Sequence, residues 1–366
     1  MMGRPTVVVA MSGGVDSSVA AALLVEQGYP VIGVMLRLWS EPGSADSNRC
    51  CTPDAMAGAR RVAAKLGIPF YALDSQDLFH GTVVQAFMDG YRRGITPNPC
   101  ILCNQKIRWG FMLEQAQEMG AEFMATGHYA RLRRAEDGQV ELLRSTDPQK
   151  DQSYVMSALP QEKLRHTMFP IGEMTKAMVR EHARRFGLTV AERKESQDLC
   201  FLAGDDYRNF LARHVPEVTQ PGRIIDSSGR QVGEHSGLAF YTIGQRKGIG
   251  IAAPTPLYVI DKNLATNELI IGQVNELGRD GLIASEMNWI SGNAPKEPFH
   301  AEVKIRYRAM LTPAEITPEG TDKITVRFPK PMRDITAGQR IVIYNGEVAV
   351  GGGTIEESFN SRRGQA

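Results

Sequence analysis

The sequence predicts an α/β chain in which an N-terminal parallel-sheet domain is followed by a small central α+β domain and a C-terminal β-barrel. Up to about residue 205, apolar strand-like runs alternate with helix patterns, which is typical of a parallel sheet with crossover helices. Residues 207–276 are rich in turns. From Leu277 onward, short alternating strands broken by Pro and Gly favour a closed barrel. We therefore predict domains at 1–206, 207–276 and 277–366.

The N-terminal domain begins with a continuously apolar run at residues 6–11, the pattern of a strand buried on both faces. Later runs repeat this pattern and are separated by stretches with helical periodicity. Strands are predicted at 31–36, 70–73 and 123–126 and helices at 55–66 and 112–119, while the barrel strands are predicted at 302–307, 323–328, 340–344 and 348–355.

Residues 12–18 read Ser-Gly-Gly-Val-Asp-Ser-Ser and connect the first strand to a helix-like stretch. Such a turn directs backbone N–H groups at an anion, and the helix dipole strengthens the field. Gly13 and Gly14 allow close approach of the backbone, the serines offer hydroxyl donors, and Asp16 could hold magnesium. A turn without a ligand could explain any three of these residues, but the seven together favour a phosphate site.

This loop is not a Walker loop, because the chain contains no G-x-x-x-x-G-K-[ST] with its phosphate-binding lysine. It resembles the loop of the PP-loop ATP pyrophosphatases. That resemblance implies that the β and γ phosphates of ATP are bound as a leaving pyrophosphate and that AMP is transferred to a substrate oxygen.

Composition indicates an ordinary soluble protein, with 42% hydrophobic and 23% charged residues among 366. No run approaches the ~20 apolar residues of a membrane span, and the N-terminus has no apolar signal core, so we expect a cytoplasmic protein without a membrane. A net charge of +1 argues against a uniformly basic nucleic-acid binder. Basic residues nevertheless outnumber acidic ones by seven to three over 92–134 and by six to two over 176–194, which indicates local basic surface for a polyanionic partner.

The five cysteines, an odd number, argue against a disulfide framework and favour thiol chemistry or a metal. Cys100 and Cys103 form a C-x-x-C in a proline-led turn that opens a helix-like stretch at 106–116, and a helix N-terminus favours the thiolate. Cys200 lies far away in the sequence. A four-cysteine zinc site is the alternative, but its first two ligands would be adjacent, whereas structural zinc ligands come as spaced pairs. Its ligands would be Cys50, Cys51, Cys100 and Cys103.

Residues 248–253 match the dinucleotide pattern G-x-G-x-x-A, but the context excludes that function. The pattern follows a basic loop instead of a strand and runs into Pro254 and Pro256, which prevent the required helix. We interpret the segment as a loop that places Arg246 and Lys247 against phosphates, with a plain surface loop as the alternative.

Six ordered motifs together resemble the tRNA-specific 2-thiouridylases of the MnmA/TrmU family, and the resemblance runs almost to the C-terminus. They are Ser-Gly-Gly-Val-Asp-Ser-Ser (12–18), Thr-Pro-Asn-Pro-Cys-Ile-Leu-Cys-Asn (96–104), Ala-Thr-Gly-His-Tyr-Ala-Arg (125–131), Lys-Asp-Gln-Ser-Tyr (150–154), Glu-Ser-Gln-Asp-Leu-Cys-Phe (195–201) and Thr-Ile-Gly-Gln-Arg-Lys-Gly (242–248).

The resemblance implies a two-step reaction with ATP and Mg²⁺ on tRNA. ATP adenylates the C2 oxygen of the wobble uridine U34 in the Lys, Glu and Gln acceptors, and sulfur then displaces AMP to leave 2-thiouridine. Cys200 would carry a persulfide received from a cysteine desulfurase or a sulfur-relay protein. Cys103 would release that sulfur or close a transient disulfide with Cys200.

The resemblance also implies three sets of binding residues. The target base would be flipped out of its stack to be reached. His128 could equally be a satisfied core histidine, and Arg306 and Tyr307 ordinary barrel-surface residues. The ATP set is Ala10, Met11, Ser12, Gly13, Gly14, Val15, Asp16, Ser17, Ser18, Met35 and Gly127; the target-base set is Asn98, Pro99 and Cys100; the tRNA set is His128, Lys150, Asp151, Gln152, Arg306, Tyr307 and Gln339.

Two alternatives stay open for the chemistry. Some relatives carry Asp in place of Cys100, so this thiol could move a proton, or Cys100, Cys103 and Cys200 could hold an iron–sulfur cluster with one open iron. We favour the persulfide because no fourth spaced ligand accompanies the C-x-x-C.

Two other functions are also considered. A small-molecule ligase would share the PP-loop without needing the thiols, and a non-catalytic RNA-binding protein would leave the loop glycines and Asp16 without a purpose.

Overall fold

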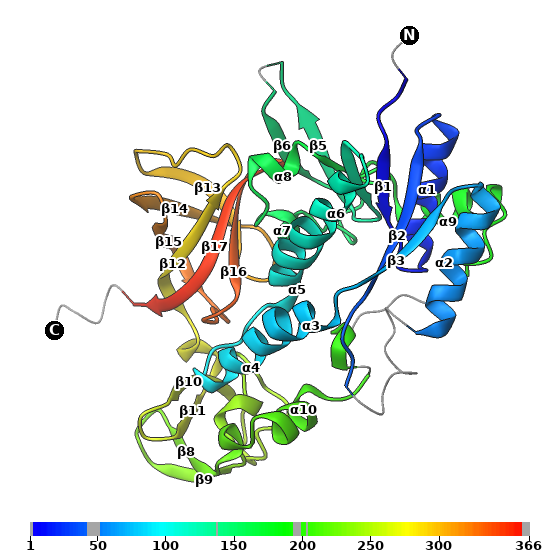
Figure 1. Ribbon diagram of the computed structural model, residues 1–366. Coiled ribbons are helices and arrows are strands. Elements are labelled where there is room, and N and C mark those ends of the chain that lie inside the picture. Colours follow the sequence, from blue (N-terminus) through cyan, green and yellow to red (C-terminus); the bar gives the residue numbers. More distant parts are fainter. Residues whose placement is uncertain (1–2, 42–51, 137, 193–198, 203, 361–366) are drawn as a thin grey trace.

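Three sheets organise the chain in the computed structural model, which describes residues 3–41, 52–136, 138–192, 199–202 and 204–360 (Figure 1). Cys50 and Cys51, the first pair of the alternative zinc site, lie outside the described residues. A parallel sheet lies in the N-terminal part, a smaller sheet in the centre and a barrel at the C-terminal end, so the predicted fold class is confirmed.

The first sheet has five parallel strands in the order β3-β2-β1-β4-β7. Ala10 at the end of β1 pairs with Val34 in β2 and with Thr126 at the end of β4. The carboxyl ends of these strands therefore share one edge of the sheet. The strands are β1 (Val7–Ala10), β2 (Val31–Arg37), β3 (Phe70–Asp74), β4 (Phe123–Thr126) and β7 (Thr167–Met168), and the four runs predicted from the sequence are all strands.

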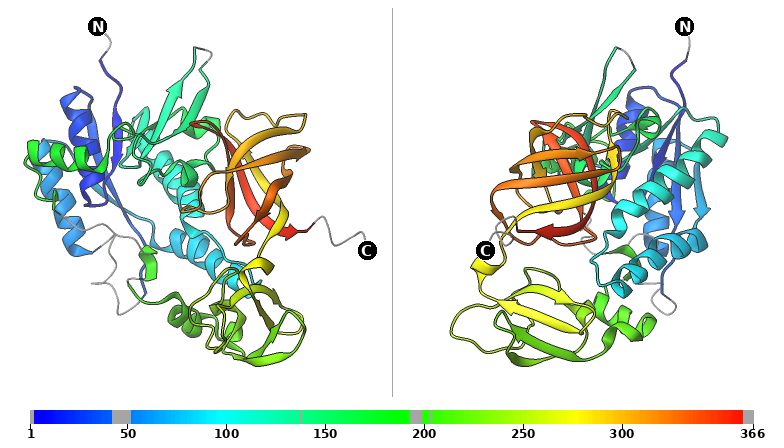
Figure 2. Two further views of the ribbon diagram at one scale, coloured as in Figure 1. Left: turned by 180° about the vertical axis from the view of Figure 1, so that it is seen from behind. Right: turned by 90° about the vertical axis from the view of Figure 1, so that its left-hand side faces the viewer.

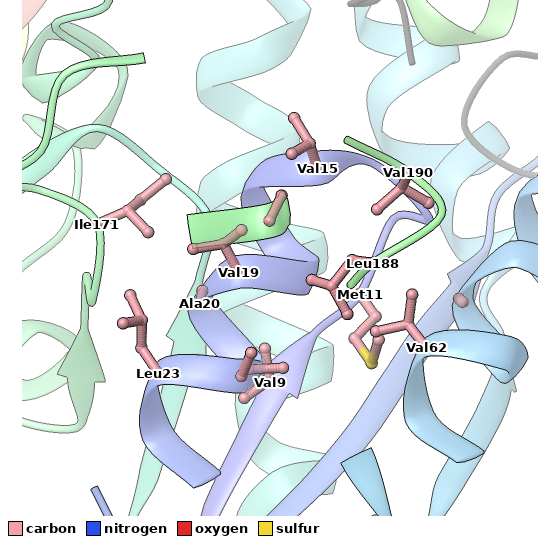
Figure 3. Packing of buried hydrophobic residues seen from close by; sticks show 14 of the residues in the cluster. Val9, Met11, Val15, Val19, Ala20, Leu23, Val62, Ile171, Leu188 and Val190 are labelled. Carbon is pink, nitrogen blue, oxygen red and sulfur yellow. The ribbon is translucent and has the colours of Figure 1, made fainter. Parts of the chain in front are cut away.

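Helix α1 (Val15–Glu26) lies on one face of this sheet between α2 (Pro53–Leu66) and α9 (Lys176–Arg185). Figure 3 shows Val19 and Leu23 of α1 packed over the strand that carries Val9. Because neighbours flank it on both sides, α1 is buried around most of its circumference, which suits its run of small alanines.

The opposite face is covered by a long helical stretch that begins at Pro99, directly after Asn98 at the capping position. Val8 of β1 packs into this face with Trp109 and Met112. The helical stretches predicted at 106–116 and 112–119 are therefore parts of one longer helix, which also includes both cysteines of the C-x-x-C. The stretch consists of α5 (Pro99–Leu102), the π-helical η2 (Cys103–Met112) and α6 (Leu113–Glu118), and it is preceded by α3 (Gln76–Phe79), η1 (His80–Val84) and α4 (Gln85–Arg92).

A hairpin of the N-terminal part joins the barrel sheet, which the sequence did not indicate. Strands β5 (Ala130–Arg134) and β6 (Val140–Arg144) form the hairpin, and Leu142 and Leu143 of β6 pair with Ala349 and Val348 of the barrel. The short helices α7 (Ser153–Met156) and α8 (Gln161–Leu164) follow it.

The central part contains α10 (Tyr207–His214) and a four-stranded sheet in the order β10-β11-β8-β9. No helix forms over 244–257, as Pro254 and Pro256 predict. The remaining elements are η3 (Cys200–Leu202), η4 (Pro216–Thr219), β8 (Gly222–Asp226), β9 (Gln231–His235), η5 (Leu238–Phe240), β10 (Tyr258–Asn263) and β11 (Glu268–Gly272).

The C-terminal strands close into a barrel because β12 pairs with both β15 and β17. In both views of Figure 2 this barrel, coloured orange to red, lies beside the N-terminal part and above the central sheet. The strand predicted at 302–307 was placed too late, and strands β12 and β14 were not predicted. After η6 (Val274–Glu276) come β12 (Arg279–Trp289), β13 (Phe299–Lys304), β14 (Thr312–Glu319), β15 (Lys323–Met332), β16 (Arg340–Asn345) and β17 (Val348–Phe359).

Across the described residues, no helix combines the length and the apolar character that crossing a membrane requires.

Candidate active site

The Ser-Gly-Gly loop lies at the carboxyl edge of the first sheet, between β1 and α1. Gly13 has φ +71°, and a Cβ there would lie 2.4 Å from the backbone oxygen of Ala55 in α2, so glycine is required for two independent reasons. The Ser17 hydroxyl accepts a hydrogen bond from the Ser12 backbone N–H at 3.1 Å, and the Ser18 hydroxyl donates to the Gly14 carbonyl at 2.8 Å. These bonds fold the loop around the N-terminus of a twelve-residue helix, which is a suitable site for phosphate.

Asp16 in the first turn of α1 has two partners from distant segments. The Lys176 ammonium donates to both carboxylate oxygens, at 2.7 and 2.8 Å, and the Tyr129 hydroxyl donates at 2.8 Å. Within the described residues no group of three or more His, Cys, Asp or Glu could hold a metal ion. Asp16 therefore supplies a single carboxylate, which fits a magnesium ion held mainly by substrate phosphates.

Sequence reasoning missed both partners of Asp16. Tyr129 lies within the motif at 125–131 and Lys176 within the basic stretch 176–194, and neither pattern indicates a contact with Asp16. Thr175 caps α9, since its hydroxyl accepts the Met178 N–H at 3.3 Å. The available sequence signal for Lys176 is therefore its place directly after a threonine that can cap a helix. That signal alone does not indicate which loop the lysine reaches.

Gly127 follows β4 and lies on the first turn of α1. A Cβ at this position would lie 2.5 Å from the Ser17 backbone nitrogen and 2.6 Å from the Asp16 carbonyl carbon. The structure thus brings Gly127 to the phosphate loop, although the two are far apart in sequence. Met35, predicted for the same ATP site, lies in β2 with a 1% exposed side chain that belongs to the same core cluster as Met11.

His128 is held by hydrogen bonds on both ring nitrogens. Burial, with a smaller contribution from the nearby Arg108 guanidinium, lowers the pKa of His128 well below its ordinary value, so the ring is neutral at neutral pH. Arg108 can only donate, so Nε2 accepts from it at 3.1 Å and Nδ1–H donates to the Thr126 hydroxyl at 2.8 Å. This geometry favours the satisfied-histidine alternative, and a tRNA contact by His128 stays a prediction.

The motif Lys150-Asp151-Gln152 serves mainly internal contacts. Asp151 is buried, and its carboxylate accepts the backbone N–H groups of Ser145 and Ser153, each at 3.1 Å. It also pairs with Lys304 of the barrel at 3.5 Å. Gln152 accepts the Tyr129 N–H through its side chain at 2.9 Å and donates its own N–H to the Tyr129 carbonyl at 2.7 Å. Gln152 therefore fixes the backbone of Tyr129, whose hydroxyl contacts Asp16, and the adjacent Asp151 connects this region to the barrel.

The barrel borders the segment predicted to meet the target base. The Gln339 side chain donates to the Thr96 carbonyl at 2.9 Å, and the Tyr154 hydroxyl donates to the Arg340 carbonyl of the barrel at 2.7 Å. The Tyr154 ring lies 6.0 Å from that of Tyr307. Pro99 is buried, Cys100 is exposed, and the Arg306 guanidinium pairs with Asp334 at 3.1 Å.

Cys103 and Cys200 contribute to the same hydrophobic cluster although they are far apart in sequence. Cys103 is 8% exposed and belongs to a core cluster with several aromatic rings, and the partly buried Cys200 packs against the same cluster. Phe201 anchors the η3 turn there, since its ring centre lies 5.1 Å from Phe87 and 5.6 Å from Phe210. We call this group of residues the cysteine cluster; its rings are Phe79, Phe87, Tyr91, Phe201 and Phe210.

The cysteine cluster lies beyond the same sheet edge as the phosphate loop. Leu38 and Trp39, which directly follow β2, pack against it. Because β2 is the parallel neighbour of β1, its carboxyl end and the phosphate loop leave the sheet on the same side. One edge of the sheet thus carries both a phosphate site and two thiols.

Profiles of known protein families match almost the whole chain. Residues 5–204 match the family profile described as the tRNA methyl transferase HUP domain, residues 208–273 its PRC-barrel domain, and residues 279–355 the aminomethyltransferase beta-barrel domain. A tRNA-specific 2-thiouridylase MnmA of Carboxydothermus hydrogenoformans is 46% identical over 98% of this chain and 99% of its own length. The proteins of the same name from Geobacter metallireducens and Clostridioides difficile are 45% and 43% identical, over 97% and 98% of this chain and 98% and 100% of their own lengths.

Proposed function

The chain belongs to the family of the tRNA-specific 2-thiouridylases, and from this premise we propose that it uses ATP to thiolate the wobble uridine of tRNA. The observation that carries the proposal is the single sheet edge that bears both the phosphate loop and the cysteine cluster. Adenylation and sulfur transfer must occur on the same uridine, so both sites have to border one space.

In the first step the C2 oxygen of the uridine attacks the α-phosphorus of ATP, and the electrons of the broken bond leave with pyrophosphate. The N–H groups at the start of α1 would bind the phosphates, and Asp16 with the phosphate oxygens would hold magnesium, which supplies charge neutralisation. The base would enter between Asn98 in the N-terminal part and Tyr307 and Gln339 of the barrel, which is supported by the contact of Gln339 with Thr96 and of Tyr307 with Tyr154.

In the second step sulfur replaces the adenylated oxygen. Cys200 would carry a persulfide received from a cysteine desulfurase or a sulfur-relay protein. The Cys103 thiolate attacks the inner sulfur of that persulfide, the released hydrosulfide attacks C2, and AMP leaves with the oxygen. A Cys103–Cys200 disulfide results, and a cellular thiol must reduce it before the next turnover. The substrates we propose are the Lys, Glu and Gln acceptors.

The domain limits at 206 and 276 stay part of this proposal. They are supported by the three matched segments, which leave out residues 205–207 and 274–278.

Replacement of Asp16 tests the nucleotide half of the reaction. Asp16→Ala should abolish tRNA-dependent AMP formation and leave tRNA binding largely intact, because only the nucleotide site loses its carboxylate. Asp54→Ala is a matched control, since Asp54 is an exposed acidic residue in the first turn of α2 and should keep full activity. Unchanged AMP production by Asp16→Ala would refute the assignment.

Replacement of the cysteines tests the sulfur half. Cys200→Ser should still form AMP on tRNA at a low rate but no 2-thiouridine from a persulfide donor, because adenylation needs no thiol. Cys103→Ser should load a persulfide on Cys200 and then stall. Full thiolation by Cys200→Ser with such a donor would exclude the persulfide. Iron that is lost together with activity when any of Cys100, Cys103 or Cys200 is replaced would favour the cluster alternative.

A further inference from the structure

Lys176 is the charged residue at the phosphate loop to which neither the sequence motifs nor the family resemblance gives a role. Its ammonium reaches from the start of α9 to both carboxylate oxygens of Asp16, at 2.7 and 2.8 Å, and its side chain is only 13% exposed. Residues 12–18 contain no lysine or arginine of their own. The cation at this loop therefore comes from a different helix.

The ammonium is held in place by its surroundings as well as by Asp16. Thr175 caps the helix, and the backbone N–H of Lys176 donates to the Asp147 carboxylate at 3.0 Å, so the first turn of α9 is fixed. The Nζ atom also lies 5.8 Å from the centre of the Tyr129 ring. Because the backbone of Lys176 is fixed and its aliphatic chain is partly buried, the side chain loses little further conformational entropy when it binds a ligand.

Electrostatics explains why such a cation is needed there. The start of α1 offers only about half a positive charge, and the Asp16 carboxylate would repel a triphosphate at close range. Pairing with Lys176 neutralises that carboxylate in the nucleotide-free protein. A magnesium ion that arrives with ATP competes for Asp16, which releases the ammonium a few ångströms from the site of the phosphates.

We propose that Lys176 exchanges partners during the reaction, leaving Asp16 to bind phosphate oxygens of ATP and the leaving pyrophosphate; this rests on the function proposed above. The ammonium acts by charge and hydrogen bonding and transfers no proton in this step. It stabilises the negative charge that collects on the pyrophosphate oxygen as the bond to the α-phosphorus breaks and the bond to the uridine oxygen forms. Lys176 thus performs, from α9, the task that a Walker loop assigns to its own lysine.

The direct test is the binding of inorganic pyrophosphate with magnesium, measured by calorimetry without tRNA. Lys176→Met should weaken this binding at least about 10-fold and slow tRNA-dependent AMP formation by about 100- to 1,000-fold, the usual effect of losing one preorganised donor. Lys176→Arg should recover much of the binding. Arg184→Ala, which removes an exposed charge from the same helix, should match the wild type in both assays.

A double variant separates phosphate binding from simple neutralisation of Asp16. If Lys176 only neutralises the carboxylate, Asp16→Asn combined with Lys176→Met should bind pyrophosphate as well as Asp16→Asn alone. The proposal predicts that the double variant binds more weakly than Asp16→Asn. Equal binding by these two variants, or wild-type affinity in Lys176→Met, would overturn the proposal. A wild-type protein that binds pyrophosphate but forms no AMP on tRNA would instead refute the proposed function.

Discussion

Gly127→Ala should disable the nucleotide site through a backbone clash. The added Cβ would lie 2.5 Å from the Ser17 nitrogen and 2.6 Å from the Asp16 carbonyl carbon, both of which are backbone atoms that cannot rotate away. An ordinary contact needs at least 3.4 Å, so the first turn of α1 or the loop after β4 must move by about 0.9 Å. Overpacking of this kind costs about 1–3 kcal/mol of unfolding free energy.

The same displacement should affect catalysis more than stability. A shift of about 1 Å in a positioned group can cost about 100-fold in rate, so we expect tRNA-dependent AMP formation to fall by about that factor. The matched control is Gly81→Ala: no atom lies within 4 Å of a Cβ there, and in a helix alanine is preferred over glycine by about 0.5–1 kcal/mol. Wild-type AMP formation by a folded Gly127→Ala protein would refute the view that this contact positions the phosphate loop.

Three further predictions address RNA binding, the cysteine cluster and pH. Affinity for tRNA should fall with rising salt, and Lys150→Ala should reduce the slope by about one charge; salt-independent binding in filter assays would contradict this. Phe201→Ala should cost about 3–5 kcal/mol and slow oxidative formation of a Cys103–Cys200 disulfide, as followed by peptide mapping, whereas Phe328→Ala in the barrel core should leave that rate unchanged. Because the folded pKa of His128 is lowered from 6.5, the unfolded chain binds the extra proton first, so stability should fall as pH drops below about 6.5, by at most about 1.4 kcal/mol per pH unit. Denaturation of His128→Gln should show a weaker pH dependence, and an equal dependence would contradict the prediction.

The parts of the site that are continuous in sequence could be predicted from it. Val7, Val8 and Val9 are fully buried, as expected for a central parallel strand, and Gly13 in the loop that follows has the positive φ that favours glycine. The C-x-x-C is predicted in a turn that opens a helix, and it lies in the first turns of that helix. These features depend on neighbours within a few residues, so the local sequence pattern is sufficient to predict them.

The missed features depend on contacts between distant segments. No local signal indicates that Lys176 reaches Asp16, because that contact requires α9 to pack against α1. The pairing of β6 with β17 joins residues of two different domains, and an alternating strand pattern does not specify its partner. The family resemblance implies that Asp151 contacts tRNA, and nothing in the local sequence indicates that its carboxylate is buried against Lys304 of the barrel.

The same long-range contacts bind the barrel to the phosphate loop. Gln152 holds Tyr129, whose hydroxyl holds Asp16, while the adjacent Asp151 pairs with Lys304 of the barrel. The antiparallel pairing of β6 with β17 is a second connection between the N-terminal part and the barrel. A base bound against the barrel therefore has a nearly fixed position relative to the nucleotide.

The turn that carries Cys200 packs against the cysteine cluster through apolar contacts. Phe201 of this turn packs against Phe87 and Phe210 in the cysteine cluster, to which Cys103 also belongs. Apolar contacts have no directional requirement and can be broken and remade without leaving a buried polar group unpaired. The two halves of the proposed reaction would thus place opposite demands on the fold. Adenylation would need the polar link between barrel and phosphate loop, whereas the proposed delivery of sulfur by Cys200 would need an attachment that can open to a donor protein and close again.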